Sequence, residues 1–407
     1  MQSFPLTGRR IIELGTMLAA PFAAHILSQL GAEVIKVEPP TGDSTRSLVR
    51  GGPSGTFIAY SHGKKSVCID LTKPEGYSAL CLLLKGADAL VHNLSPKAAR
   101  KLKITREECE AINPKLIYCH IRGYAAGPQA DDLASNPVAE ASTGVMEGNR
   151  VNGRPSRLGP SYHDQFAGAY AVIGILTSML QMQKDEKPNP VEIGLYETGL
   201  HLASRDLVGV QLKTQLLGRA EREPHGEFSM PGYGAYRTAD DRWVYLLMLT
   251  DSHWAKFCQA MNLPVNEAYA TLRQRKKVRE EVEELVRNTM AAYSFDEVVK
   301  RLNSAGMGFT EVLPLERVLD APQAQYGNKL RHLEFRGYSF DIPEFPRLNQ
   351  GEGDIATLPP ASLGEHTAEL LRAAGATAEE YQSLLDAGAI AEAATDKCVW
   401  APVRREA

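Results

Sequence analysis

The first 120 residues alternate short runs rich in β-branched residues with longer runs of helical character. This alternation limits the possible folds more than any other feature. The short runs lie at 10–14, 34–37, 66–70, 89–91 and 116–121, with helical stretches such as 18–30 and 77–84 between them. Strands that alternate with helices build βαβ units, in which the strands run parallel and the helices cover both faces of the sheet. The sequence therefore predicts an α/β domain built on a parallel sheet.

Composition excludes several classes of protein. A formal net charge of −4 argues against a nucleic-acid binder, which normally carries a strongly basic face. The six cysteines are scattered without C-x-x-C spacing, which argues against a disulfide framework and a zinc site and favours a reducing cytoplasm. We read no secretory signal, and no uncharged apolar stretch of the roughly 18 residues that a membrane span needs. A soluble, cytoplasmic protein is expected.

The second half of the chain indicates a further unit. Residues 128–160 read as an irregular connection before an apolar helix at about 165–182 and a strand at 190–194. A linker is expected at 219–234, followed by a hairpin over 236–249 that turns at Asp240 and Asp241. Residues 276–304 have the spacing of an amphipathic helix. Proline-rich extended chain (341–346, 359–360) and helices at 365–373 and 378–387 complete the sequence.

Familiar cofactor and hydrolase motifs are missing. The segment after the first strand, 15–20, reads GTMLAA, which is bulky where a dinucleotide pyrophosphate needs bare backbone. There is no G-x-x-x-x-G-K-[ST], G-x-S-x-G or H-E-x-x-H, and the ten histidines form no metal-ligand pattern. We expect no metal and no permanently bound cofactor.

One long segment carries a specific resemblance. Residues 18–40, LAAPFAAHILSQLGAEVIKVEPP, followed by GDSTR at 42–46, closely resemble the class III CoA-transferases, a family that includes formyl-CoA transferase, carnitine CoA-transferase and α-methylacyl-CoA racemase. Further matching blocks follow in order at 63–71, 87–93, 113–118 with Gly123-Tyr124, 191–197 and 363–366. The resemblance spans nearly the whole chain.

The resemblance implies a particular architecture. The fold would be a Rossmann-like large domain over 1–218, completed by 335–407, with a smaller α+β domain and its linkers over 219–334. Two chains would interlock like links, as a homodimer or as a heteromer with a paralogous subunit. Coenzyme A would be a co-substrate, and the partners would be an acyl-CoA, such as succinyl-CoA, and a carboxylic acid.

The resemblance also assigns a nucleophile. Asp164, in PSYHDQFAGAY at 160–170, matches the aspartate that attacks the acyl-CoA thioester to form a mixed anhydride and then an aspartyl-CoA thioester. A carboxylate can do this because a thioester is already activated. Taken locally, Asp164 could instead be the N-cap of the following helix. The neighbouring His163 either contacts the acyl carboxylate or, as we favour, packs.

Other positions match the family's ligand contacts. CoA-binding positions follow the strands, where ligands of open α/β sheets bind; by resemblance they are Met17, Leu18, Ile69, Asn93, Leu94, Arg122 and Tyr124. Arg100 and Lys101 are candidate phosphate partners, or alternatively part of a solvated helix face, and Lys101 better matches the family's arginine. The glycine-rich lid of some members corresponds here to Gly232, Tyr233 and Gly234, which alternatively are turn residues of a hairpin.

Two competing functions remain open. The racemases use a histidine in a Gly-His-Asp segment, which reads Ala134-Ser135-Asn136 here. Neither Ser135 nor Asn136 can act as a general base near neutral pH, so a transferase is favoured over a racemase or isomerase. The other alternative is a non-catalytic CoA-binding subunit that works with a paralogous chain.

Overall fold

The computed structural model describes residues 4–48, 54–185, 187–218, 230–264, 266–327, 329–346 and 358–393. The chain divides into two compact units, one formed by 1–147, 151–208 and 326–407 and the other by 148–150 and 209–325. The sequence predicted the boundaries of the second domain at 218/219 and 334/335, whereas the structure has them at 208/209 and 325/326. Most of the predicted linker at 219–234 lies outside the described residues.

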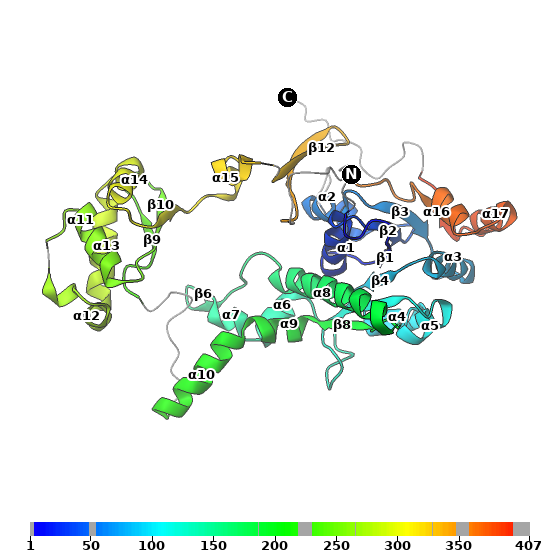
Figure 1. Ribbon diagram of the computed structural model, residues 1–407, viewed down its shortest axis with the longest axis horizontal. Coiled ribbons are helices and arrows are strands. Elements are labelled where there is room, and N and C mark those ends of the chain that lie inside the picture. The colour runs from blue at the N-terminus through cyan, green and yellow to red at the C-terminus, as the bar shows by residue number, and fades with distance from the viewer. Residues whose placement is uncertain are drawn as a thin grey trace. The chain divides into compact units, whose positions relative to one another are not determined.

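A seven-stranded sheet forms the centre of the first unit (Figure 1). Six of its strands are parallel: β1 (Arg10–Leu14), β2 (Glu33–Glu38), β3 (Lys65–Ile69), β4 (Ala89–His92), β5 (Ile117–Arg122) and β8 (Val191–Gly194). The order is β14-β3-β2-β1-β4-β5-β8, which is Rossmann-like. The predicted parallel sheet is confirmed, with one addition: β14 (Ile390–Ala391) runs antiparallel along β3 at the edge. The order changes direction between β1 and β4, the position where such sheets bind ligands.

Helices cover both faces of this sheet, as predicted. On one face lie α1 (Ala19–Gln29) and α8 (Tyr162–Asp185), with α6 (Asn136–Ser142) and α9 (Leu195–Leu202) against α8. On the other face lie α3 (Pro74–Lys85), α5 (Arg106–Ile112), α16 (Thr367–Ala373) and α17 (Ala378–Asp386). α1 and α8 touch closely at Gly168, where a Cβ atom would stand 2.7 Å from the carbonyl oxygen of Ala19. This contact packs α8 closely against the start of α1.

The segment 128–160 is less irregular than the sequence predicts. It contains α6, the short helix α7 (Val145–Gly148) and a small hairpin of β6 (Arg150–Val151) and β7 (Arg154–Pro155). The start of α6 had a readable signal, since Ser135 precedes it and Pro137 occupies its first turn, where proline loses no hydrogen bond. This helix supplies residues to the candidate site described below.

The second unit combines a small antiparallel sheet with helices. Its strands β9 (Gly234–Arg237), β10 (Trp243–Leu246) and β11 (Phe309–Glu311) pack against α11 (Asp251–Ala260), α13 (Arg279–Ala291) and α14 (Phe295–Ser304), with α12 (Leu272–Lys277) beside α13. The predicted hairpin is confirmed, and Asp241 in its turn has φ 64°. The single helix expected over 276–304 is two helices, because Ser294 caps a new one.

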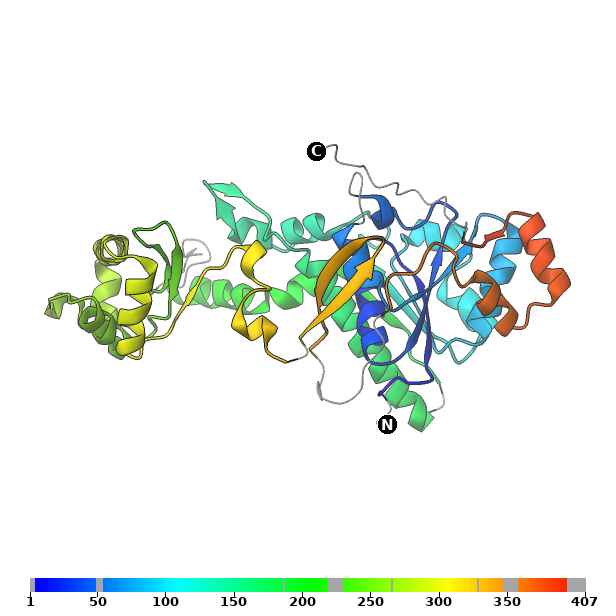
Figure 2. The ribbon, with the colours of Figure 1, turned by 90° about the horizontal axis from the view of Figure 1, so that it is seen from above.

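A second hairpin belongs to the first unit. Its strands are β12 (Leu330–Phe335) and β13 (Tyr338–Pro343), so part of the segment expected to be extended linker is a strand. Figure 2 shows this hairpin beside the N-terminal helices. Leu333 and Ile342 pack on Ile58 of α2 (Gly55–Ser61). The hairpin therefore stays attached to the large unit.

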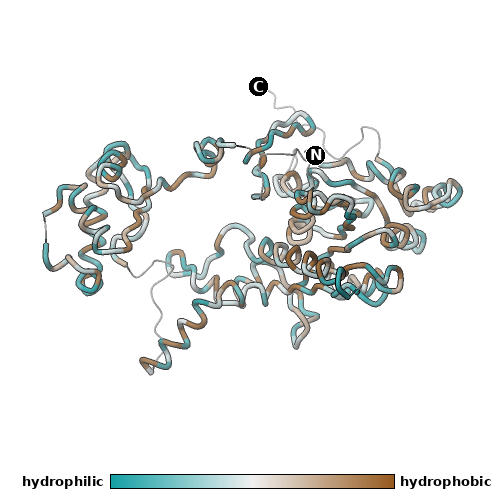
Figure 3. Tube along the Cα trace, in the orientation of Figure 1, coloured by the Kyte–Doolittle hydropathy of each residue, from teal (hydrophilic) through white to brown (hydrophobic). Residues whose placement is uncertain are grey.

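Two helices carry hydrophobic residues along their traces (Figure 3) and expose several large apolar side chains. By length and composition α8 could span a membrane, which corrects the expectation that no such stretch exists, but its inner side packs in the core of the α/β unit. Its outer side exposes Phe166, Ile173 and Leu180. In α10 (Ser204–Leu217) no residue is buried, and six large apolar residues are exposed: Leu207, Val208, Val210, Leu212, Leu216 and Leu217.

Candidate active site

Asp164 is the third residue of α8, and its side chain is partly exposed. Among the described residues, none donates a hydrogen bond to its carboxylate. The predicted apolar helix begins earlier than expected, at Tyr162, so Asp164 lies inside the first turn. The interpretation of Asp164 as the N-cap is therefore wrong, and its side chain is available for other contacts.

The capping function belongs to another helix. The side-chain oxygen Oδ1 of Asn136, at the start of α6, accepts the backbone N–H of His163 at 2.9 Å and that of Asp164 at 3.4 Å. The first N–H groups of a helix lack intrahelical partners and need an acceptor of this kind. Sequence reasoning missed this role because 27 residues separate Asn136 from His163.

The surroundings of Asp164 change its acidity. Burial raises the pKa of its carboxyl group to about 6; Arg157 opposes this shift and Glu140 adds to it. Glu140 is fully buried on α6, and its Oε1 lies 3.8 Å from the Nε atom of Arg157. At neutral pH the carboxylate is therefore mainly ionised, but it is a stronger base than an ordinary aspartate.

His163 turns away from solvent. Its side chain is buried, and its Nε2 atom lies 3.3 Å from the hydroxyl of Thr143. On α9, a Cβ atom at Gly199 would stand 2.6 Å from the same Nε2 atom, so only glycine fits there. The imidazole therefore packs between α6 and α9.

The next residue of α8 reaches the N-terminal helices. The Nε2 atom of Gln165 donates to the hydroxyl of Tyr60 on α2 at 3.1 Å, and the Tyr60 ring meets Phe22 of α1 edge to face at 5.3 Å. These contacts join α8 to α1 and α2 beside Asp164. The sequence contained no motif that marked Tyr60 or Gln165.

The turn after β1 and the turn after β4 meet at the switch point of the sheet. The backbone N–H of Thr16 donates to the side-chain oxygen of Asn93 at 3.0 Å, and the side-chain amide of Asn93 donates back to the Thr16 carbonyl at 2.9 Å. Met17 follows with φ 64° and is 47% exposed. Four of the predicted positions (Met17, Leu18, Asn93 and Leu94) therefore lie together at one edge.

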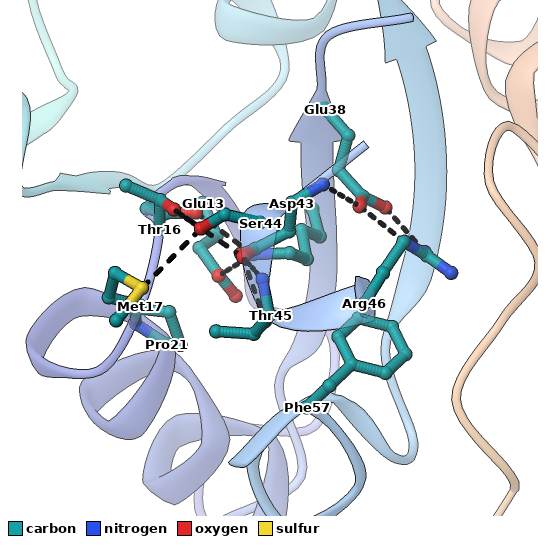
Figure 4. Close-up of polar contacts among 12 residues, drawn as sticks. Glu13, Thr16, Met17, Pro21, Glu38, Asp43, Ser44, Thr45, Arg46 and Phe57 are labelled. Carbon is teal, nitrogen blue, oxygen red and sulfur yellow. Dashed lines mark hydrogen bonds and ion pairs between the residues drawn. The ribbon is translucent and has the colours of Figure 1, made fainter. Parts of the chain in front are cut away.

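A buried cluster of charges supports the first of these turns. Figure 4 labels its members Glu13 and Asp43 and shows the hydrogen bonds of Asp43 with Glu38 and Thr45. Glu13 is inaccessible to solvent and accepts from the ammonium groups of Lys36 at 2.7 Å and Lys64 at 2.6 Å. The Lys36 ammonium also donates to the Gly15 carbonyl at 2.9 Å and pairs with Asp43 at 2.8 Å. The cluster thus connects β1, β2 and the turn that carries Met17.

Burial and pairing act differently on the two lysines. Burial depresses the pKa of Lys36, but Glu13, Asp43 and Glu38 outweigh it and hold that pKa above the usual value. Burial lowers the pKa of Lys64 to about 8 against the opposing charge of Glu13. Lys36 therefore stays charged at neutral pH, because the carboxylates around it outweigh the cost of burying its ammonium group.

Two of the predicted arginines line one hollow. Arg100 of α4 (Pro96–Lys101) and Arg122 at the end of β5 belong to a cavity of about 370 Å³ that also includes His120 and Glu192. Arg122 pairs with Glu192 at 3.4 Å, and Arg100 pairs with Asp131 at 3.1 Å. Lys101 is exposed and does not line this hollow.

Two other predicted positions keep their side chains inside. Ile69 is 1% exposed in the core, between β2 and β14. Tyr124 is buried, with its ring 5.6 Å from that of Tyr196. The Tyr124 residue keeps 7% of its surface exposed.

The residues of the predicted lid lie in the second unit. The backbone N–H of Gly232 donates to Glu283 at 3.0 Å, and the residue has φ 87°. Tyr233 meets Tyr245 edge to face, and Gly234 is the first residue of β9. In this unit the three residues form the entry to the hairpin.

Metal-ligand clusters, cysteines and a second hollow are the other features that bear on chemistry in the part of the chain that the structure describes. No group of three or more His, Cys, Asp and Glu side chains there could hold a metal ion. The five described cysteines are free, and Cys398 lies outside the described residues. A hollow of about 610 Å³ on the second unit contains none of the predicted site residues.

Comparison with known proteins establishes the family. The model for CoA-transferase family III matches residues 6–367. The chain belongs to this family. The beta subunit of succinyl-CoA–L-malate CoA-transferase from Chloroflexus aurantiacus is 30% identical to this class III CoA-transferase over 390 residues, covering 91% of this chain and 94% of the relative. The predicted family and enzyme class are confirmed.

Further relatives agree with this assignment. Human succinyl-CoA:glutarate CoA-transferase is 27% identical to this CoA-transferase, covering 90% of this chain and 85% of the relative. Among solved structures, a CAIB/BAIF family protein from Brucella suis aligns with TM-score 0.80 at 23% identity, over 92% of this chain and 100% of that one. The structural match supports the fold of the CoA-transferase.

Proposed function

We propose that this CoA-transferase moves CoA from an acyl-CoA to a carboxylic acid through covalent intermediates on Asp164. The observation that carries the proposal is the state of this side chain. Its carboxylate is partly exposed and accepts no hydrogen bond from the described residues, while its backbone is held by Asn136. A carboxylate that is not engaged in structure can act as a nucleophile.

The proposed reaction proceeds in four displacements. A carboxylate oxygen of Asp164 attacks the thioester carbonyl, and the C–S bond breaks to give a mixed anhydride and CoA thiolate. The thiolate attacks the Asp164 carbonyl, releasing the donor acid and leaving an aspartyl-CoA thioester. The acceptor carboxylate attacks this thioester, which gives a second anhydride and frees the thiolate again. The thiolate then attacks the acceptor carbonyl, so that a new acyl-CoA leaves and Asp164 is restored.

We infer that CoA binds where the first and fourth parallel strands end. The exposed Met17 turn is joined there to Asn93, and the guanidinium groups of Arg100 and Arg122 are candidates for its phosphates. The glycine-rich turn at 232–234 remains a candidate lid, since glycines allow backbone N–H groups to approach a developing oxyanion.

Trapping the intermediate tests the mechanism. The enzyme is incubated with succinyl-CoA, quenched with hydroxylamine or borohydride, digested and analysed by mass spectrometry. We expect the modification at Asp164, because both intermediates make its carbonyl electrophilic. A fully active preparation in which this residue stays unmodified during turnover would contradict the mechanism.

The acidity of Asp164 gives a pH dependence. Its pKa of about 6 means that the nucleophilic carboxylate is lost as the pH falls through that value. We expect kcat/KM for the acyl-CoA to fall about tenfold per pH unit below pH 6 and to level off above it. Rates measured between pH 4.5 and 8 in constant-ionic-strength buffers check this. A limb near pH 4 would indicate an ordinary, solvated aspartate.

Relatives indicate which acids to test. Similar proteins are named for succinyl-CoA with malate, citramalate or glutarate, all of them dicarboxylic acids. We infer succinyl-CoA as the donor and a dicarboxylic acid as the acceptor. A screen of dicarboxylic, aromatic and monocarboxylic acids with succinyl-CoA, read as new acyl-CoA by chromatography, tests both assignments. Activity confined to monocarboxylic acceptors would refute the inference.

Assembly with a second chain is part of the proposal. The exposed apolar residues of α8 and α10 need a cover in water, and we infer an interlocked dimer. Chloroflexus aurantiacus relatives are named as alpha and beta subunits, so a paralogous partner is the second candidate. Light scattering of the purified chain gives its oligomeric state, and assaying the chain alone shows whether it needs another subunit.

A further inference from the structure

The carboxamide of Asn136 is held in one orientation. It is 2% exposed, and while Oδ1 accepts the two N–H groups of α8, its Nδ2 donates to Oε1 of Glu140, one turn further along α6, at 2.5 Å. A carboxylate can only accept hydrogen bonds, so Glu140 fixes the amide nitrogen on its own side. The amide oxygen must then face the start of α8.

Glu140 is also anchored on its other side. Its Oε2 accepts the backbone N–H of Leu158 at 3.2 Å, and Arg157 lies next to Oε1. The segment at 157–158 leads directly into α8. The fully buried Glu140 therefore joins α6, this segment and, through Asn136, the turn that contains Asp164.

We propose that Asn136 and Glu140 are positioning residues, a buried pair that holds the first turn of α8 so that the carboxylate of Asp164 faces the reacting acyl group. Neither residue touches substrate in this role. The inference rests on the proposed function of Asp164. It gives Asn136 and Glu140 a role that the sequence did not indicate, and it explains why the nucleophile does not have to cap its own helix.

The pair makes a specific demand on hydrogen bonding. Asn136→Asp keeps the acceptor for the α8 amides but sets a second carboxylate against Glu140. In Glu140→Gln the side chain keeps one acceptor oxygen, which can accept from either the Asn136 amide or the Leu158 N–H. Its own amide nitrogen, a donor, then faces the other of these two donors. The double variant restores the match, because the new glutamine donates to the new aspartate and accepts from Leu158, and the net charge stays the same.

The test compares these variants with the wild type in single turnover with succinyl-CoA, followed as modification of Asp164. We expect Asn136→Ala to slow modification about 100-fold, because small misplacements of a reacting group have effects of this size, with the Kd for CoA within about threefold. Asn136→Asp and Glu140→Gln should each lose activity as well. The double variant should recover to within about tenfold of the wild type. The matched control is Asn113→Ala, which removes amide contacts to the carbonyls of Leu84 and Ala87 elsewhere in the unit and should leave the rate unchanged.

Two further readouts separate positioning from general loss of structure. Backbone amide exchange without substrate should accelerate at His163 and Asp164 in Asn136→Ala, while the rest of α8 stays protected. In Glu140→Gln the acid limb of the rate profile should move to lower pH, since a negative charge near Asp164 is lost. Arg157, whose positive charge lowers the pKa of Asp164, is still present in this variant. The other titratable neighbour, His163, has its ring against Thr143 and Gly199.

The outcomes are distinct. The proposal would be overturned if Asn136→Ala were modified at the wild-type rate. It would also be overturned if the double variant were modified no faster than the slower of Asn136→Asp and Glu140→Gln. If Asn136→Ala does not fold, the comparison of the double variant with these single variants still tests the proposal. If the wild type is not modified at all, the proposed function fails, while amide exchange still reports whether the pair holds the turn.

Discussion

Asp164→Asn is expected to remove CoA transfer, with kcat at least ~10³-fold lower and CoA binding nearly unchanged. The amide has the size of the carboxylate, but it is a poor nucleophile and cannot form the anhydride. The backbone N–H of residue 164 keeps its contact with Asn136, so α8 should remain in place. The measurement is transfer between succinyl-CoA and a dicarboxylic acid, together with calorimetric titration of CoA.

Two controls make this result specific. Asp185→Asn changes the same residue type at the exposed C-terminal end of α8 and should keep full activity. Asp164→Ala should match Asp164→Asn at once, whereas slow deamidation of the asparagine would restore activity with time. If Asp164→Asn transferred CoA at the wild-type rate when freshly prepared, another residue would carry the acyl group.

Glu13→Gln is expected to lower the free energy of unfolding by about 3–5 kcal/mol, the largest effect on stability that we predict. Glu13 is the shared acceptor of two buried ammonium groups, Lys36 and Lys64. A glutamine of the same shape carries no charge, so both cations lose their common counter-ion in a place that water does not reach. The measurement is the urea concentration at the midpoint of unfolding of the large unit. Hydrogen exchange of the backbone amides in β1 and β2 monitors this transition.

The matched control for this prediction is Glu369→Gln. Glu369 also accepts from a lysine, Lys65, at 2.7 Å, but its side chain is 59% exposed. Water replaces an exposed partner, so we expect a change below about 1 kcal/mol. Equal effects of the two substitutions would mean that the charges around Glu13 are better hydrated than their burial indicates.

The charge cluster also connects stability with binding. Lys36 donates to the Gly15 carbonyl, two residues before Met17, whose backbone has a positive φ. In Glu13→Gln the turn loses part of its support, and weaker CoA binding should accompany the loss of stability. A variant that is less stable but binds CoA normally would separate the two roles.

Much of the fold could be predicted from local sequence. Strands such as β1 and β2 are short runs that contain β-branched residues, and α1 is a longer apolar run. Strand and helix could therefore be told apart from the sequence. Element ends were less certain, and for α8 a difference of three residues changed the interpretation of Asp164. The first turn of that helix donates a backbone N–H to Asn136, which lies on another element.

The sequence alone therefore determined the parallel α/β unit, the family and the residue that matches its nucleophile. These rest on periodicity and on ordered motifs, both of which are properties of neighbouring residues. Only the tertiary structure decided that Asp164 is not a cap, that His163 packs inside, and that Glu13 holds two lysines. Each of these depends on side chains that lie far apart in the chain, and burial, which sets their hydrogen bonding and acidity, exists only after folding.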